Sequence, residues 1–196
     1  FRRVLFRSYN GHGRTPGTRN RGEVMAGGWA LALKNLLMPQ YCRQCGERIL
    51  TEENPHYCPA CWEESPRIER PLCGICGHPH PPGVGLLTPI TAQAFPCGPC
   101  AVRTDDRQWR RTIGAARYEG PVGEAIRLLK FHGRVNLVQP LAALLEGPIY
   151  RELTPEAYDY IVPVPLHRVR QRERGYNQSA LIAEAILPWF AKARLD

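Results

Sequence analysis

Apolar residues in the second half of the chain recur at spacings typical of alternating strands and helices. Residues 112–118 have the composition of a strand. A helix is predicted to open at Pro121, because proline suits a first helical turn, and to end near Gly133. A second helix is predicted between Asn136, as its cap, and Gly147. The apolar positions at helical spacing are Val122, Ala125, Ile126, Leu129, Leu137, Leu141, Leu144 and Leu145. This alternation predicts an α/β fold with a parallel sheet.

Residues 158–185 continue the pattern as a strand, an arginine-rich turn and a helix. The β-branched run at 161–164 is typical of a strand covered on both faces, and its prolines end the pairing after the second residue. Gly175 then releases the backbone, and Asn177 or Ser179 can cap the next helix. Beyond that helix, the two aromatic residues at 189–190 have no predicted place to be buried.

The turn in this stretch carries arginine at every second position. These residues are Arg168, Arg170, Arg172 and Arg174. A glycine turn that opens a helix after a strand presents backbone N–H groups to phosphate, and guanidinium groups add bidentate hydrogen bonds. The alternative is a solvated basic loop, since the turn lacks a complete GxGxxG or Walker motif.

The cysteine spacing is the strongest chemical signal. All eight cysteines fall in four CxxC pairs: Cys42 and Cys45, Cys58 and Cys61, Cys73 and Cys76, Cys97 and Cys100. Two such pairs complete a tetrahedral Cys₄ zinc shell, so two structural zinc ions are predicted, paired either sequentially or in crossed order. Disulfides would require an export signal that residues 25–40 lack, and iron–sulfur ligands are less evenly spaced. With eight thiolates available, the nearby His56, His78 and His80 are expected to be spectators.

Charge and composition change this picture little. The net charge is +8 over 196 residues, but residues 1–24 hold six arginines against one glutamate and so supply +5 of it. This segment precedes Met25 and is predicted to be a disordered or non-native leader. Two zinc–tetrathiolate sites would bring the remaining +3 to about −1, which removes the charge argument for nucleic acid. No apolar run reaches membrane-span length, so a cytoplasmic protein is expected.

The chain is therefore predicted to have four parts. A leader occupies residues 1–24, a short helix 25–40, a double zinc ribbon 41–102, and an α/β domain 103–196. The boundary before the last part is placed where the composition changes, around residues 104–111.

Three features together resemble the ComF family of bacterial competence-related proteins. They are the four CxxC pairs, the segment RYEGPVGEAIRLLKFHGR and the segment DYIVPVPLHRVRQRERGYNQSALIAEA. The resemblance covers about residues 36–187 and implies a double zinc ribbon followed by a phosphoribosyltransferase-like domain. It also implies a pyrophosphate- or phosphate-binding set formed by Lys130, Gly133, Arg134, Arg172, Arg174, Gly175 and Asn177.

One departure from the family pattern limits the expected activity. The family's acidic Asp-Asp and Thr-Thr-Gly motif, which holds phosphoribosyl pyrophosphate, does not occur in these 196 residues; the only Asp-Asp pair is Asp105 and Asp106. The chain is therefore expected to represent a partial, C-terminally truncated phosphoribosyltransferase-like domain that is inactive alone, with Mg²⁺ and phosphoribosyl pyrophosphate as ligands of a full-length form. The residues leave both an enzyme and a purely binding protein open.

Two other functions compete with this one. The first is a zinc-ribbon module that binds single-stranded DNA without catalysis, with Tyr57, Trp62 or Trp109 as stacking faces. Packing of these aromatics against the zinc knuckles is the competing interpretation. The second is docking of competence or helicase proteins on the ribbons, which is compatible with either of the other functions.

Overall fold

The computed structural model describes residues 35–81, 95–102 and 111–196. The chain divides into two compact units, Phe1–Pro39 and Gln40–Asp196. In the first unit residues 35–37 are helical and Pro39 follows them, as predicted for the end of the short helix. The predicted leader at 1–24 lies outside the described residues, and so does the predicted domain boundary at 104–111 except for its last residue.

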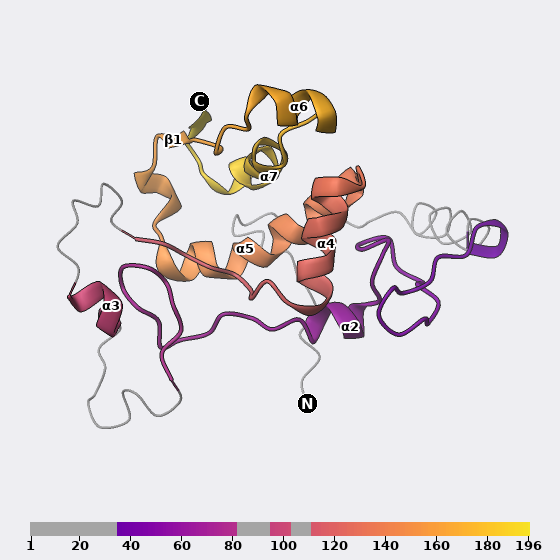
Figure 1. The fold of residues 1–196 in the computed structure, drawn as a ribbon, viewed down its shortest axis with the longest axis horizontal. Coiled ribbons are helices and arrows are strands. Elements are labelled where there is room, and N and C mark those ends of the chain that lie inside the picture. Colours follow the sequence, from indigo (N-terminus) through magenta and orange to yellow (C-terminus); the bar gives the residue numbers. More distant parts are fainter. Residues whose placement is uncertain (1–34, 82–94, 103–110) are drawn as a thin grey trace, which may run out of the picture. The chain divides into compact units, whose positions relative to one another are not determined.

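The described part of the unit Gln40–Asp196 contains short helices, three longer helices and a small sheet (Figure 1). In chain order the described elements are α2 (Pro59–Glu63), α3 (Gly98–Ala101), α4 (Gly120–Phe131), η1 (Val135–Leu137), α5 (Val138–Glu152), η2 (Pro155–Ala157), β1 (Tyr160–Ile161), α6 (Arg168–Arg174), α7 (Gln178–Ile186), η3 (Leu187–Trp189) and β2 (Arg194–Leu195). The long helix α5 packs against both α4 and α7.

Helix α4 forms where its residue spacing predicts it. Gly120 has a φ of 53° and Pro121 lies in the first turn, so the backbone turns sharply into the helix. Ala125 and Leu129 are 0% and 1% exposed, which confirms the apolar face. The helix ends at Phe131, and the chain then leaves it through Gly133 at a φ of 65°.

The prediction for α5 was wrong at both ends. Asn136 lies within η1 and caps nothing, because its side chain is hydrogen-bonded to His56 instead. Gly147 does not end the helix, which continues through Pro148 to Glu152. Pro148 and Ile149 are buried, so packing of the last turns maintains the helix past two residues that disfavour it.

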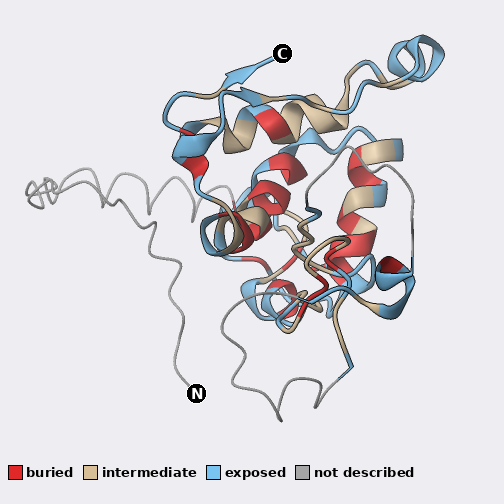
Figure 2. Ribbon diagram, turned by 90° about the vertical axis from the view of Figure 1, so that its left-hand side faces the viewer, coloured by how far each residue is buried: buried red, intermediate tan, exposed pale blue. Residues whose placement is uncertain are grey.

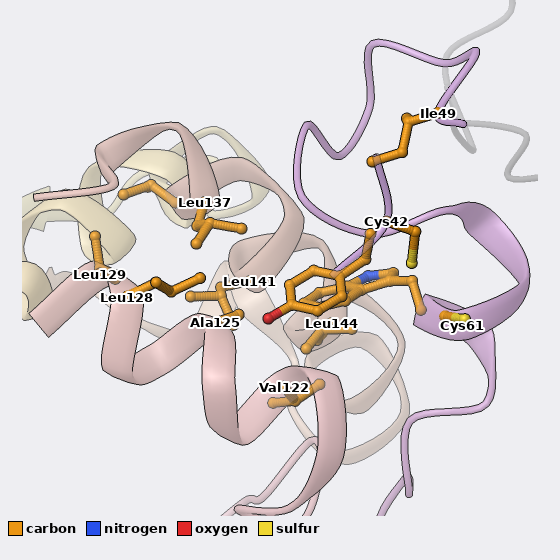
Figure 3. Packing of buried hydrophobic residues seen from close by; sticks show 13 residues of the cluster. Cys42, Ile49, Cys61, Val122, Ala125, Leu128, Leu129, Leu137, Leu141 and Leu144 are labelled. Carbon is orange, nitrogen blue, oxygen red and sulfur yellow. The ribbon is translucent and has the colours of Figure 1, made fainter. Parts of the chain in front are cut away.

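The hydrophobic core joins the first cysteine-containing segment to the helices (Figure 3). From the segment come Cys42, Ile49, Tyr57, Cys61 and Trp62, and from the helical region come Val122, Ala125, Leu128, Leu129, Leu137, Val138, Leu141 and Leu144. Figure 2 shows the buried positions on the helix faces that point inward. One continuous core therefore crosses between the two parts of this unit.

The sheet is smaller than the sequence predicts. Strands β1 and β2 form a parallel pair in which Tyr160 pairs with Arg194, and no other strand occurs in the described part of the chain. The predicted strand at 112–118 is wrong: the segment has only an isolated bridge between Ala116 and Arg67. Its glycine and alanines offer little apolar surface to bury, so it runs as an irregular segment beside the ribbon region.

The predicted burial of the run at 161–164 was also wrong. Pairing stops at Ile161, as its prolines require, but Val162 and Val164 are 65% and 73% exposed. The arginine-rich segment is the helix α6, without a buried residue, and not a turn. Phe190, for which no burial was predicted, is 8% exposed and packs edge-on against Tyr158 at a ring distance of 6.2 Å.

Candidate metal centres and anion-binding segments

The eight cysteines gather into two groups of four, in sequential order. The first cage comprises Cys42, Cys45, Cys58 and Cys61, and the second cage comprises Cys73, Cys76, Cys97 and Cys100. Within each cage all Sγ atoms lie within 4.8 Å of one another. The sequential pairing is thus confirmed over the crossed one, and all eight cysteines are free of disulfide bonds.

The sulfur spacing fits zinc. A tetrahedral site with Zn–S distances of about 2.3 Å has S···S separations of about 3.8 Å. The Sγ atoms of Cys45 and Cys58 are 3.7 Å apart, and those of Cys76 and Cys97 are 3.8 Å apart. Four thiolates fill the coordination shell of each zinc ion, so either metal would stabilise the fold and would leave no open position for a substrate.

Each cage combines a glycine-containing knuckle with a short helix. The knuckles turn through Gly46 and Gly77, with φ values of 76° and 69°. Helix α2 then carries Cys61, and helix α3 carries Cys100. Because the second cysteine of a pair follows within one turn, both sulfurs point to the same side.

Backbone N–H groups stabilise the thiolate form of one cysteine in each cage. The N–H groups of Cys76 and Cys97 donate to the Sγ of Cys73 at 3.5 and 3.2 Å. Burial raises the pKa of Cys73, but these and further backbone hydrogen bonds outweigh it and lower the pKa to about 6. The pKa of Cys42 in the first cage is lowered to about 6 by the same balance. Deprotonated sulfur is the form that binds zinc.

His56 and His80, which lie near the cages, have side-chain contacts with other residues. The Nε2 atom of His56 lies 3.2 Å from the Oδ1 atom of Asn136. His80 stacks on Phe95 at a ring distance of 4.2 Å, and its Nε2 atom contacts the Phe95 carbonyl oxygen. The metal-ligand groups of the described residues contain no histidine, which agrees with the prediction that these histidines are spectators.

Two aromatic residues proposed as stacking faces are part of the core. Tyr57 and Trp62 are 0% and 7% exposed, and their rings stack on each other at 5.6 Å. They cannot receive a nucleobase, so the packing interpretation is confirmed for both residues; the small ribbon needs their apolar cover. Trp109 lies outside the described residues.

The two basic segments predicted to bind phosphate lie next to each other. The Arg174 guanidinium lies over the Phe131 ring at 5.7 Å, and the Tyr176 hydroxyl donates to the Leu129 carbonyl oxygen. These contacts join the C-terminal end of α4, which carries Lys130, to the connection between α6 and α7. The sequence analysis did not predict a role for Phe131 or Tyr176. The position of the Phe131 ring directly after Lys130 was the one local signal for it.

The backbone of the α6–α7 connection has the geometry expected of its sequence. Gly175 has a φ of 83° and ends α6. Asn177 caps α7: its side-chain oxygen accepts from the Ser179 N–H at 3.0 Å, and its amide donates to the Val164 carbonyl oxygen at 3.0 Å. Arg174 also donates to the Gln178 side chain. The capping prediction for Asn177 is confirmed.

Several basic side chains in these segments have no acidic partner among the described residues. Within residues 35–81, 95–102 and 111–196, no carboxylate forms an ion pair with Lys130, Arg134 or Arg172, whereas Arg170 pairs with Glu173 at 3.2 Å. Uncompensated cations grouped at two neighbouring helix ends favour an anionic ligand.

Comparison with known proteins bears on the family to which the chain belongs. A family model described as a double zinc ribbon domain matches residues 33–101. The DNA utilization protein YhgH of Escherichia coli K12 is 30% identical over 135 residues, which cover 67% of this chain and 54% of that protein. Competence protein F of Haemophilus influenzae is 29% identical over 125 residues, covering 61% of this chain and 48% of that protein.

Competence protein ComFC of Bacillus subtilis is 25% identical over 142 residues, covering 70% of this chain and 54% of that protein. The chain thus spans about half the length of the curated relatives it matches. No solved structure matches it. No helix in the described part of the chain has the length and apolar character needed to cross a membrane. The double zinc ribbon and the similarity to these competence proteins place the chain in the ComF family.

Proposed function

We propose that this chain supplies the pyrophosphate-binding side of a phosphoribosyltransferase-like protein that takes part in DNA uptake. The link to DNA uptake is supported by relatives that are named DNA utilization and competence proteins. The ligand of a protein of the relatives' length is phosphoribosyl pyrophosphate or a nucleotide phosphate, bound with Mg²⁺. The zinc ions stabilise the ribbon and take no part in the chemistry.

The contact between Arg174 and Phe131 is the observation that carries this proposal. It brings together two basic segments more than 40 residues apart in the sequence. Lys130, Gly133 and Arg134 approach from the end of α4, and Arg172, Arg174 and Gly175 from the end of α6. Guanidinium groups bind phosphate oxygens in bidentate fashion, and glycine permits close approach of the backbone.

Phosphoribosyl transfer would gain from such a site at one defined step. When the bond between the anomeric carbon and pyrophosphate breaks, negative charge develops on the leaving group. Fixed cations that contact the leaving pyrophosphate stabilise that charge more in the transition state than in the ground state. Transfer is completed when an acceptor substrate forms the new bond to the anomeric carbon.

Calorimetric titration of pyrophosphate into the purified chain, with and without Mg²⁺, tests the proposal. The wild-type chain should bind, and Arg174→Ala should weaken binding about tenfold or more because a charge-assisted hydrogen-bonding partner is lost. Arg174→Lys should give an intermediate loss, since it keeps the charge but not the planar fork.

Arg170→Ala is the matched control. It removes the same charge from the same helix, but Arg170 is paired with Glu173. Its pyrophosphate affinity should stay within about twofold of the wild type. Equal losses in the two alanine variants would mean that only net charge matters, and a wild-type chain that does not bind pyrophosphate would contradict the proposed function.

A second candidate, binding of single-stranded DNA, is favoured by two exposed aromatic rings. Phe131 and Tyr118 are 68% and 56% exposed, and each lies beneath a guanidinium, from Arg174 and Arg127 respectively. Such pairs can stack bases and hold phosphates. Binding of an oligonucleotide should then weaken steeply as salt is raised, and should weaken further in Phe131→Ala. An affinity that is independent of salt would exclude this candidate.

A further inference from the structure

The two zinc cages are attached to the rest of the unit in different ways. Cys42 and Cys61 of the first cage belong to the core cluster that contains α4 and α5. Among the described residues of that cluster there is no cysteine of the second cage. The second cage is instead flanked by Arg70 and Arg111, which both contact Glu152 at the end of α5. Of the two cages, the first is therefore the one in direct contact with α4.

Two side chains next to the first cage contact α4 and the turn that follows it. The Nε atom of Arg43, which follows Cys42 directly, lies 2.8 Å from a Glu124 carboxylate oxygen in the middle of α4. His56, two residues before Cys58, contacts Asn136 at 3.2 Å. Because the amide oxygen can only accept, the Nε2 atom of His56 carries the proton in this contact.

The same two residues are joined through the backbone. The N–H group of Arg43 donates to the carbonyl oxygen of His56 at 3.0 Å, across the cage. Closing the cage therefore fixes the distance between the two contacts. The Arg43–Glu124 contact precedes the basic C-terminal end of α4, and the His56–Asn136 contact follows it. The first cage is therefore linked to the chain on both sides of that end.

At the end of α4, Leu129 and Phe131 are held by Tyr176 and Arg174, whereas the turn at 132–136 has few other long-range restraints among the described residues. Its backbone hydrogen bonds are local: the N–H groups of His132 and Arg134 donate to the Leu128 carbonyl, and those of Val135 and Leu137 donate to carbonyls within the turn. Leu137 is fully buried and anchors the far side of the segment. The His56–Asn136 hydrogen bond is the side-chain contact that attaches the turn itself to the ribbon, among the hydrogen bonds of the described residues.

We propose that Arg43 and His56 are positioning residues through which the first zinc cage orders residues 130–137, the turn with Lys130, Gly133 and Arg134. Zinc in the first cage closes the backbone link between the two residues and so sets the place of the turn. The second cage has no such role, since the neighbouring Arg70 and Arg111 form their ion pairs with Glu152 at the end of α5. The consequence for pyrophosphate affinity rests on the proposed function, whereas the ordering of the turn does not.

Amide hydrogen–deuterium exchange of the zinc-loaded chain tests the ordering directly. His56→Ala, Asn136→Ala and Arg43→Gln should each speed exchange at residues 130–137 by about two- to tenfold, the effect of losing one hydrogen bond. His56→Gln should restore slow exchange, because its amide N–H can reach the position of the Nε2 atom. The double variant His56→Ala/Asn136→Ala should exchange at residues 130–137 no faster than Asn136→Ala alone.

Matched variants at the second cage provide the control. Arg70→Gln and His80→Ala should leave exchange at 130–137 unchanged, and Arg70→Gln should speed it at residues 148–153. Zinc content, measured for every variant, should remain two per chain. Unchanged exchange at 130–137 in both His56→Ala and Asn136→Ala would overturn the proposal, and so would equal effects from the second-cage variants.

Pyrophosphate titration of the same proteins separates this inference from the proposed function. If both hold, His56→Ala and Asn136→Ala lower pyrophosphate affinity and His56→Gln restores it. If the wild-type chain does not bind pyrophosphate, the proposed function fails, while the exchange rates still decide the ordering of the turn.

Discussion

Glu152 is the residue with the densest ionic contacts among the described residues. Its side chain is 1% exposed and receives hydrogen bonds from Arg70 at 2.8 and 2.9 Å, as well as from Arg111 and Arg151. The hydrogen bond from Arg70 is the main cause that lowers the pKa of Glu152, and the charge of Arg111 adds to it. A carboxyl with a lowered pKa stabilises the fold above its unfolded pKa and loses that contribution only in acid.

Replacing Glu152 by glutamine should lower the free energy of unfolding by roughly 2 kcal/mol at pH 7. Breaking a buried ion pair costs more than this, but the arginines are partly exposed, so solvent screens the interaction. Urea unfolding at neutral pH measures the loss. Glu173→Gln is the control, because Glu173 and Arg170 are exposed at 58% and 68%, and the loss there should stay below about 0.5 kcal/mol. Equal losses at the two positions would contradict the role of burial.

At the scale of elements, the connection between α6 and α7 depends on one side chain that has two roles. Asn177 caps α7 with its oxygen and holds the Val164 backbone with its amide group. Asn177→Ala removes both and should lower the free energy of unfolding by about 1–2 kcal/mol. Asn177→Asp keeps the cap oxygen and should lose less.

Thermal and urea unfolding, followed by circular dichroism, compare the two variants. If Asn177→Asp were as unstable as Asn177→Ala, the tether to Val164 and not the cap would be the stabilising contact. Pyrophosphate titration gives an independent readout: the added carboxylate should repel the anion in Asn177→Asp even where its stability is close to that of the wild type.

Gly175 ends α6 by its backbone conformation alone. Its φ is 83°, and an added Cβ would meet no atom within 4 Å. Gly175→Ala should therefore cost about 1–2 kcal/mol of backbone strain without any steric clash. Gly175→Asn, which tolerates the left-handed region better, should recover part of the loss. Urea unfolding measures both, and identical stability of the alanine variant and the wild type would mean that the chain leaves this conformation at little cost.

At the scale of the whole unit Gln40–Asp196, the two cages should contribute unequally to stability. Cys42→Ser and Cys73→Ser should each reduce zinc from two to one per chain, because binding of a structural metal and local folding are coupled. Only Cys42→Ser should also disturb the core that contains Tyr57 and Trp62. The near-ultraviolet circular dichroism of these rings should fall in Cys42→Ser and persist in Cys73→Ser.

Metal analysis and unfolding curves complete the comparison. Cys42→Ser should lower the unfolding midpoint of the whole unit, whereas Cys73→Ser should lose the second cage locally and retain the helices. Unchanged zinc content in either variant would contradict the assignment of its cage. Equal loss of helical signal in both would contradict the difference between them.

The sequence determined the features that depend on short spacings. Two cysteines three residues apart lie on one turn whatever surrounds them, so the four pairs and their use as metal ligands could be predicted. The bounds of α4 follow from Pro121 at its start and Gly133 beyond its end, and the cap at Asn177 follows from local hydrogen bonding.

Tertiary contacts decided the rest, because their partners are far apart in the chain. Arg43 and Glu124 are separated by 81 positions, and His56 and Asn136 by 80, so no local pattern reveals either pair. The local sequence predicts a helix cap at Asn136, but its side chain binds His56 instead. It also predicts a helix end at Gly147, but packing of Ile149 extends α5. Burial and long-range hydrogen bonds outweigh local preferences of about 1 kcal/mol, and the sequence does not state where those contacts form.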